Sequence, residues 1–314
     1  SSSATTVMVV GFVNSGIMKL EQAVGIIMGA NIGTTVTSWI LGLTGIDSSS
    51  FWIQMLKPTS FSPILAIVGV AILLFSNKDK YKNVATIMVG FAVLMFGMET
   101  MSGAVKPLAE VPEFTGILTR FTNPVLGMLA GLILTAVIQS SSASVGILQA
   151  LCMTGVMPFG AAIPIIMGQN IGTCVTALLS GIGANKNARR AALVHLYFNI
   201  IGTVTFMIVF YSINLVHPFA FLEEAATPFG VAAVHSLFNV GATIVLLPFS
   251  KGLVKLACLT IRDDEDATEK NTAVDTLNLL DARFLDTPSV AVEQSKNVAV
   301  TMAELAEQSM NLSI

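Results

Sequence analysis

Long apolar runs without charge constrain this chain more than any other feature. Three of them, at 61–76, 83–98 and 191–211, approach or reach the roughly 20 apolar residues that cross a bilayer as a helix. The runs are continuous and do not alternate, which favours helices over a β-barrel. Only 11% of the 314 residues are charged and 54% are hydrophobic, whereas a soluble domain has about 25% charged residues. We therefore predict an all-α integral membrane protein, with no indication of a nucleic-acid partner.

An internal duplication is the strongest signal in the sequence. Aligning Ser1 with Ser140 without a gap places GANIGTTVTSWILGL on GQNIGTCVTALLSGI, and the same offset places SSSA on SSSA and IIMG on IIMG. Two separate motifs at one separation indicate two repeats of one structural unit. The alignment also predicts a glutamine before Ser1, to match Gln139.

Basic residues predict the orientation of the two repeats. Lys and Arg gather in three short segments, at 77–83, 185–190 and 251–262. Because short basic loops remain cytoplasmic, residues 22–45 should run outward, with the loop at 47–51 outside and Lys186 and Arg190 inside. Residues 123–155 must then enter and leave on the outer side, as a re-entrant hairpin with QSSS near its turn. We therefore predict an inverted-repeat secondary transporter with two re-entrant QSSS hairpins.

Polar motifs inside the apolar runs form the candidate site. Non-helical backbone is tolerated in a membrane only where it is buried in protein or lines a wet cavity. Ser and Gln donors suit the oxygens of an anion, and their lone pairs suit Na⁺. The paired glycines of each NIGT segment weaken a helix by roughly 1 kcal/mol each, so a broken helix is expected in both repeats. Isolated Ser and Gly strings are often only helix contacts, but their duplication in register favours a site.

Other polar residues allow two interpretations. Glu99 is either an intramembrane functional carboxylate or an interfacial residue near the outer end of its helix. His195 and His235 each have an Asn four residues later on the same helix face, which suits a packing pair, with a proton relay as the alternative. Three cysteines lack ligand-like spacing and are interpreted as packing residues: Cys152, Cys174 and Cys258. The sequence indicates no enzyme, no cofactor and no transition-metal site.

The two serine motifs, SSS at 1–3 and QSSS at 139–142, are each followed by IIMGxNIGTxVT. Together with HLYFN, they resemble the type II sodium-dependent phosphate cotransporter family over about residues 1–257, although the chain lacks the Gln of the first motif. The resemblance implies a multi-pass plasma-membrane protein that couples Na⁺ to the symport of inorganic phosphate by alternating access; it leaves a homodimer open. The implied phosphate ligands come from both serine motifs and both asparagines: Ser1, Ser2, Ser3, Ser140, Ser141, Ser142, Asn31 and Asn170. The implied sodium ligands are Gln139, Ser141, Thr34, Thr35, Thr173, Thr176 and Asn170.

Three regions are predicted along the chain. Residues 1–122 contain the first repeat and connecting helices, 123–260 the second, inverted repeat, and 261–314 a cytoplasmic helical region. The last region is charged, has apolar residues at helical spacing, and resembles the start of a PhoU-like domain that is truncated here. Two alternative functions stay open. One is a symporter of another oxyanion or a carboxylate, driven by Na⁺ or H⁺, and the other is a phosphate-sensing membrane regulator.

Overall fold

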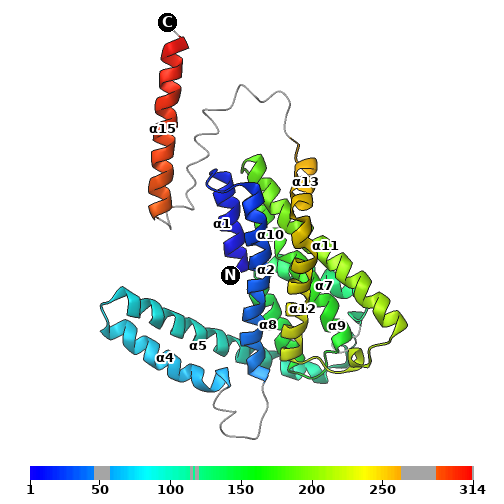
Figure 1. Cartoon of the computed structure of the whole chain (residues 1–314). Helices are drawn as coiled ribbons and strands as arrows, with labels where there is room; N and C mark the ends of the chain where they lie inside the picture. Colours follow the sequence, from blue (N-terminus) through cyan, green and yellow to red (C-terminus); the bar gives the residue numbers. More distant parts are fainter. Residues whose placement is uncertain (46–56, 114–115, 117–119, 263–287, 313–314) are drawn as a thin grey trace. The chain divides into compact units, whose positions relative to one another are not determined.

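The computed structural model describes residues 1–45, 57–113, 116, 120–262 and 288–312 (Figure 1). Regular structure in these residues is helical, apart from one isolated bridge between Pro158 and Ala225. The apolar runs at 61–76 and 83–98 form α4 (Pro58–Phe75) and α5 (Asp79–Val105), and 191–211 lies in α11 (Lys186–Val216). Six helical segments are long and apolar enough to cross a membrane: Leu20–Gly45, Pro58–Phe75, Asp79–Val105, Phe159–Ser180, Lys186–Val216 and Pro228–Thr260. The prediction of an all-α membrane protein is confirmed.

The chain divides into two compact units. Unit 1 comprises residues 1–31, 173–202 and 242–314, and unit 2 comprises residues 32–172 and 203–241. The chain passes from one unit to the other inside both NIGT motifs, after Asn31 and after Gly172. Each unit therefore contains one serine motif and parts of both repeats.

Unit 1 begins with α1 (Ser2–Asn14), which packs against α10 (Cys174–Ser180). It also contains the first part of α2 (Leu20–Gly42), the first part of α11, η4 (Leu247–Phe249), α13 (Ser250–Thr260) and α15 (Pro288–Leu312). The end of α13 is tied to the start of α11, because Arg190 donates from Nε and Nη2 to the carbonyl of Ile261 at 2.9 and 2.7 Å. Gln294 of α15 donates to the carbonyl of Ser15 at 3.0 Å.

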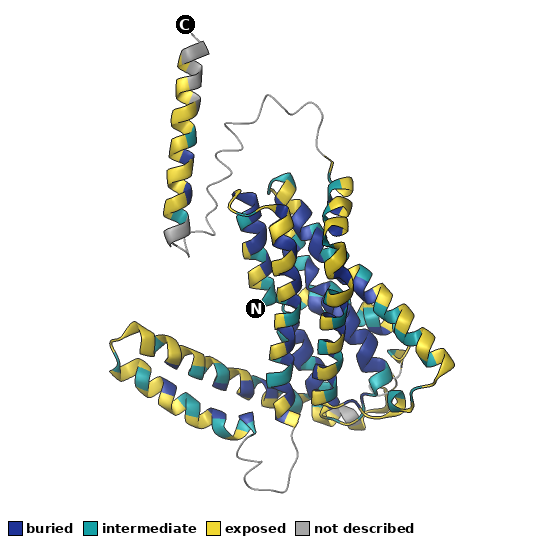
Figure 2. Cartoon of the chain, in the orientation of Figure 1, coloured by how far each residue is buried: buried dark blue, intermediate teal, exposed yellow. Residues whose placement is uncertain are grey.

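Unit 2 holds a peripheral pair of helices and a buried core helix. Its elements are the rest of α2, η1 (Leu43–Gly45), α4, α5, η2 (Lys106–Glu110), α7 (Pro124–Ile138), α8 (Ser141–Cys152), α9 (Phe159–Gly172), the end of α11, η3 (Ala220–Glu223) and the first part of α12 (Pro228–Leu246). Figure 2 shows α4 and α5 mostly exposed. In the most apolar 18-residue stretch of each helix, only 17% of α4 and 22% of α5 is buried. The segment Phe159–Ser180, which contains α9, is 72% buried in the same measure. The peripheral helices thus present apolar surface outward, as lipid-facing helices do.

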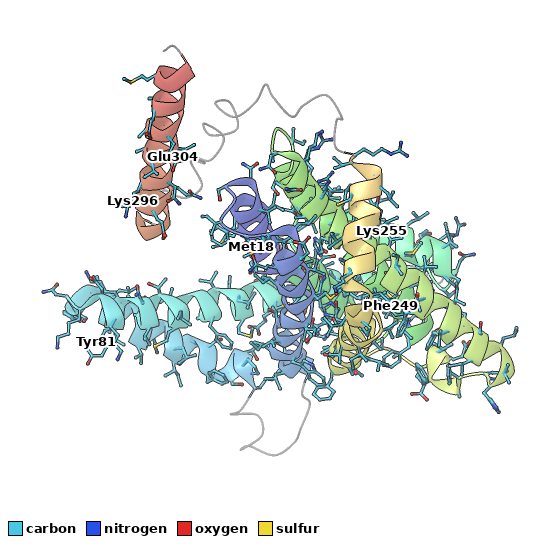
Figure 3. The ribbon with its side chains drawn as sticks, turned by 45° about the horizontal axis from the view of Figure 1, so that its top comes forward. Met18, Tyr81, Phe249, Lys255, Lys296 and Glu304 are labelled. Atoms are coloured by element: carbon cyan, nitrogen blue, oxygen red, sulfur yellow. The ribbon has the colours of Figure 1, made fainter. Side chains whose placement is uncertain are left out.

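The turn between α4 and α5 carries the basic segment 77–83. There the Lys78 ammonium lies 5.9 Å from the centroid of the Tyr81 ring, which Figure 3 labels at the end of this helix pair. Further along the pair, Phe61 and Phe91 stack with their ring centroids 5.8 Å apart. A basic, aromatic turn between two apolar helices fits a membrane interface.

Glycines bring α7 and α9 into close backbone contact. A Cβ on Gly168 would collide with the carbonyl oxygen of Met128, and one on Gly131 would collide with that of Ile165. A Cβ on Gly172 would lie 2.7 Å from the carbonyl oxygen of Leu132. Only glycine allows this approach, so these positions pack one helix of the hairpin onto the helix that follows it.

The structure reduces the predicted helix breaks to one turn residue in the second repeat. There α9 ends at Gly172 and α10 begins at Cys174, and Thr173 between them keeps helical backbone angles, with φ of -62° and ψ of -24°. In the first repeat α2 runs without interruption from Leu20 to Gly42, so the prediction there was wrong. The environments of the glycines differ accordingly: Gly168 and Gly172 press against α7, whereas Gly29 and Gly33 of α2 have no atom within 4 Å of an added Cβ.

Candidate functional site

The QSSS segment forms the tip of a helical hairpin. Helix α7 starts at Pro124, where the Asn123 side chain caps it by accepting from the backbone N–H groups of Val125 and Leu126. It ends at Ile138, and the next residue, Gln139, has a φ of 58° in the left-handed region, where the chain turns toward α8. Among the described residues, Gln139 is the only non-glycine with a positive φ. A left-handed conformation costs a residue with a side chain about 1–3 kcal/mol, so this exposed glutamine is held in a strained turn.

Serine caps the following helix in both repeats. The Ser140 hydroxyl accepts from the backbone N–H of Ala143 at 3.3 Å, and the Ser1 hydroxyl accepts from Ala4 at 3.3 Å. These positions are equivalent in the repeat alignment, so the two caps repeat the same interaction. A hydroxyl that accepts one bond can still donate its hydrogen. Capping therefore uses one lone pair of each hydroxyl, and the O–H group can still donate to an acceptor such as an anion.

Short hydrogen bonds hold the hairpin together and fasten it to α9. The Thr135 hydroxyl of α7 donates to the Ser144 hydroxyl of α8 at 2.7 Å. The Gln169 side-chain amide of α9 donates to the Ser144 carbonyl at 2.9 Å. Thr135, Ser144 and Gln169 are each no more than 1% exposed. The tip is thus supported by buried polar contacts and is positioned by three helices.

Asn170 belongs to a buried polar chain in unit 2. Its side-chain N–H group donates to the carbonyl of Ile166 at 2.8 Å, which turns its Oδ1 toward His235 Nε2 at 3.4 Å. On the other side of the ring, His235 Nδ1 lies 2.7 Å from the Ser38 hydroxyl. Because an amide oxygen only accepts, His235 donates from Nε2 and accepts at Nδ1. The histidine therefore links α2, α9 and α12.

Both histidines have the asparagine contact that their spacing predicts. The Asn239 side chain donates to the carbonyl of His235 at 2.9 Å, and Asn199 donates to the carbonyl of His195 at 3.0 Å. Asn199 also lies 3.4 Å from the Cys174 sulfur. Each asparagine thus bonds a backbone carbonyl of its own helix, and neither of these two bonds involves the imidazole ring.

The predicted ligands fall into two groups. Unit 2 contains Thr34, Thr35, Gln139, Ser140, Ser141, Ser142 and Asn170, and unit 1 contains Ser1, Ser2, Ser3, Asn31, Thr173 and Thr176. Asn31 is 4% exposed and Thr35 is 6% exposed, and the Thr35 hydroxyl donates to the Ile32 carbonyl at 2.7 Å. Asn31 Nδ2 and Thr176 Oγ1 are buried and have no hydrogen-bond partner among the described residues.

Two buried glutamines, which are not among the predicted ligands, belong to the same polar region. Gln149 donates from Nε2 to the carbonyls of Ser38 and Pro228, both at 2.9 Å, and Gln169 supports Ser144. Within the part of the chain that the structure describes, neither Oε1 has a hydrogen-bond partner. The sequence holds a signal for these residues, because each glutamine interrupts an apolar run. In the first repeat, Val10 stands in place of Gln149 and Ala30 in place of Gln169.

The carboxylate candidate Glu99 lies outside the serine and NIGT motifs. Glu99 is exposed and, with Lys57, Thr44 and Ser102, lines a small cavity of about 90 Å³. No group of three or more His, Cys, Asp or Glu side chains placed to hold a metal occurs among the described residues. The candidate site thus offers neutral hydroxyl, amide and carbonyl groups.

Comparison with known proteins gives a family match. A family model described as Na⁺/Pi-cotransporter matches residues 1–103 and 94–230. A Salmonella typhimurium protein named "Putative inorganic phosphate export protein YjbB" is 27% identical over 314 residues, covering 99% of this chain and 54% of its own length. The chain therefore spans about half the length of that relative.

Two further relatives widen the comparison. A Bacillus subtilis protein, "Uncharacterized protein YqeW", is 26% identical over 269 residues, covering 83% of this chain and 80% of its own. A Pongo abelii protein named "Sodium-dependent phosphate transport protein 2B" is 32% identical over 145 residues, covering 43% of this chain and 20% of its own. No solved structure matches the chain.

Proposed function

The chain belongs to the Na⁺/Pi-cotransporter family, and from that premise we propose that it carries inorganic phosphate across the plasma membrane as a Na⁺-coupled symporter. The observation that carries this proposal is the hairpin tip at Gln139–Ser142. It joins two apolar helices of 15 and 12 residues, each shorter than the roughly 20 residues that span a bilayer. A hairpin of this length ends its polar turn within the membrane.

The tip has the chemistry that an anion and Na⁺ require. Helix α8 begins at Ser141, and a helix N-terminus attracts anions through its free N–H groups and its dipole. The hydroxyls of Ser140, Ser141 and Ser142 add donors for phosphate oxygens. The oxygens of Gln139 and Asn170 suit Na⁺, which prefers neutral carbonyl and hydroxyl ligands when the co-bound phosphate supplies the negative charge.

Two contacts support an inverted arrangement of the repeats. In unit 1, Asn14 at the end of α1 is hydrogen-bonded to Asn185, which follows the crossing helix of the second repeat, at 2.7 and 2.8 Å. In unit 2, the counterpart of Asn14 is Met153, and its sulfur lies 4.0 Å from the hydroxyl of Thr44, which follows the crossing helix of the first repeat. Each hairpin arm thus ends beside the end of the other repeat's crossing helix. Parallel repeats would put those ends on opposite sides of the membrane.

Electrostatics favours coupling to a cation. No Lys or Arg lies inside either serine or NIGT motif, so the protein itself offers no balancing charge. A phosphate dianion that enters a negative cell interior works against about 2.3 kcal/mol per charge per 100 mV, or roughly 4.6 kcal/mol in total. Co-bound Na⁺ offsets this cost and also lowers the penalty for placing the anion in a low-dielectric cavity.

Export of phosphate is a second candidate for the direction of transport. The Salmonella typhimurium relative, which matches 99% of this chain, carries the word "export" in its name. A coupled carrier is reversible, and its net direction follows the summed gradients of its substrates. The same site would therefore serve export if the phosphate gradient exceeded the Na⁺ gradient in the cell.

The function is tested with the full-length protein in liposomes. We expect uptake of radiolabelled phosphate that needs an inward Na⁺ gradient and is reduced when Na⁺ is replaced by choline. Preloading the vesicles with phosphate and removing external phosphate tests export in the same preparation. Uptake driven equally well by a proton gradient without Na⁺, or competition by sulfate or dicarboxylates but not by arsenate, would contradict the proposal.

Serine variants test the site itself. Ser141→Ala should raise the half-saturating phosphate or Na⁺ concentration by about 10- to 150-fold, because a hydrogen bond to a charged group contributes about 1.5–3 kcal/mol. Ser2→Ala, its counterpart in the first repeat, should act alike if both repeats serve one transport step. Ser295→Ala on the exposed face of α15 is the matched control. Unchanged kinetics for Ser141→Ala across a full Na⁺ titration would show that the serine is only a packing residue.

A further inference from the structure

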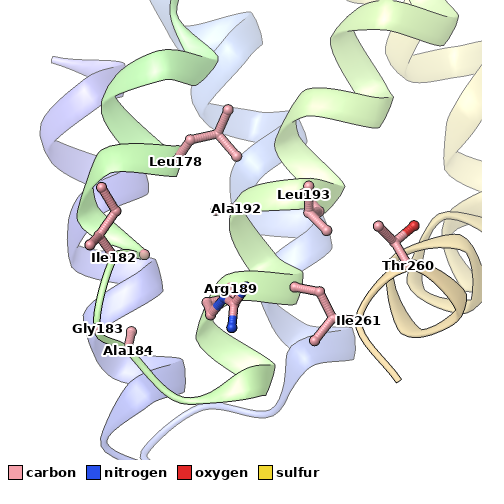
Figure 4. A pocket seen from close by; sticks show the side chains of 10 residues that line it. Leu178, Ile182, Gly183, Ala184, Arg189, Ala192, Leu193, Thr260 and Ile261 are labelled. Carbon is pink, nitrogen blue, oxygen red and sulfur yellow. The ribbon is translucent and has the colours of Figure 1, made fainter. Parts of the chain in front are cut away.

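Unit 1 contains a cavity whose lining includes no residue of the serine motifs. Its volume is about 620 Å³, and it lies between the turn at 181–184, the first turns of α11 and the end of α13 (Figure 4). Leu178, Ile182 and Leu193 line it, so much of the wall is apolar. The volume is within the range of about 300–1,000 Å³ that holds small organic ligands.

Arg189 is the one charged side chain on the lining of this cavity. It is exposed, and its guanidinium makes no hydrogen bond or ion pair with any residue that the structure describes. The adjacent Arg190 is different, since it is 5% exposed and donates to the Ile261 carbonyl and to Asn187 Oδ1. Arg190 thus fixes the wall of the cavity, while Arg189 retains its donors for a ligand.

We propose that this cavity binds an anionic phospholipid, with Arg189 on the phosphodiester and the acyl chains along the apolar wall. A guanidinium suits phosphate oxygens because its parallel N–H groups form paired, charge-assisted bonds. The apolar wall continues to the outside of the protein, where Ile182 is 76% exposed, Leu179 47% and Leu259 56%. Lipid tails cover such residues, whereas a small hydrated anion would leave them in water.

The charge distribution points to the cytoplasmic leaflet. The turn before α11 and the end of α13 belong to two of the three basic segments of the chain, 185–190 and 251–262. Segments of this kind face the cytoplasm, where anionic lipids give the membrane surface its negative potential. The site and its ligand therefore carry opposite charge on the same side of the membrane. The inference needs only membrane insertion in this orientation and is independent of phosphate transport.

Native mass spectrometry of the full-length protein tests the proposal directly. The protein in detergent is titrated with phosphatidylglycerol or with phosphatidylcholine of identical acyl chains. The detergent is then removed in the gas phase, and the lipid that stays bound is measured. We expect wild type to retain phosphatidylglycerol preferentially and Arg189→Gln to bind it at least about tenfold more weakly. Lys255→Gln is the matched control, because it removes one positive charge from an exposed position on α13 (Figure 3) without touching the cavity. Arg189→Lys keeps the charge without the paired geometry, so its binding should be intermediate.

A second variant tests the cavity while leaving its charge in place. Ala184 lines the cavity, and Ala184→Phe should exclude the lipid although Arg189 is present. If Arg189→Gln fails to fold, as judged by size exclusion and thermal unfolding in the same detergent, Ala184→Phe carries the test. Equal retention of phosphatidylglycerol by wild type and either folded variant would overturn the proposal. So would displacement of the lipid by excess inorganic phosphate that itself binds through Arg189, since the cavity would then be a site for a free anion.

Discussion

His235 Nδ1 and the Ser38 hydroxyl lie 2.7 Å apart, although 197 positions separate the two residues in the sequence. This contact joins α12 to α2, and the other ring nitrogen of His235 faces Asn170 on α9 at 3.4 Å. The ring is 1% exposed, so the two contacts occur where water cannot readily replace them. Asn170, a predicted ligand of both phosphate and Na⁺, is thereby held by a residue outside the duplicated motifs.

Replacing His235 should affect both stability and transport. His235→Ala leaves the Ser38 hydroxyl without its buried partner, and we expect a loss of about 1–3 kcal/mol in the free energy of unfolding. The half-saturating Na⁺ concentration should rise as well, because Asn170 loses the group that orients it. His217→Ala, at an exposed position after α11, should change neither quantity. Thermal unfolding in detergent and a Na⁺ titration of phosphate uptake measure the two effects, and wild-type values for both would refute the linking role.

Gln139→Gly should separate the backbone role of this residue from its ligand role. Glycine adopts the left-handed conformation without steric cost, so the variant should be as stable as wild type or up to about 1 kcal/mol more stable. If the side chain contacts Na⁺ or phosphate, transport affinity should nevertheless fall by about 10- to 150-fold. Gln139→Ala lacks the same side chain but keeps the strain, and so should lose affinity without a gain in stability. A Gln139→Gly protein with wild-type affinity would remove this residue from the site.

Gly168→Ala should disrupt the packing of α9 on α7. Its Cβ would collide with the carbonyl oxygen of Met128, which is backbone and cannot move aside as a side chain could. We expect a destabilisation of about 1–3 kcal/mol or more, as for overpacked cores. Gly90→Ala is the matched control, because it lies within α5 of the same unit with nothing within 4 Å of an added Cβ. Equal melting temperatures for the two variants would show that the close α7–α9 approach is not maintained in the membrane.

Asn185→Ala should loosen the start of α11. The Asn185 side chain accepts from the backbone N–H of Ala188 at 2.9 Å, as an N-cap does, and donates to the carbonyl of Asn14 at 2.7 Å. Loss of both should cost about 1–3 kcal/mol. Asn185→Asp keeps the cap but cannot donate, so it should recover only part of the loss. Thermal unfolding ranks the three proteins, and an Asn185→Asp protein as unstable as Asn185→Ala would show that the cap contributes nothing.

Cysteine labelling tests the inverted topology. In a background without Cys152, Cys174 and Cys258, a cysteine at exposed Asn187 should react only from the cytoplasmic side. A cysteine in the loop at 47–51, which lies outside the described residues, should react only from outside. Labelling of both from one side would contradict the inverted repeats.

By itself, the sequence determined that this protein lies in a membrane and is helical. It also showed the duplication and the position of the hairpin turn. These properties are local: they depend on apolar run length, on serine and asparagine as caps, and on motif identity at a fixed offset. The tertiary structure decided what depends on neighbours distant in the chain. Identical NIGT segments meet different neighbours: Gly168 and Gly172 press against α7, whereas Gly29 and Gly33 of α2 have no atom within 4 Å of an added Cβ. Likewise, no local pattern predicts that His235 contacts Ser38, or that Arg189 lines a cavity while Arg190 donates to the Ile261 carbonyl. Packing between distant segments selects those partners.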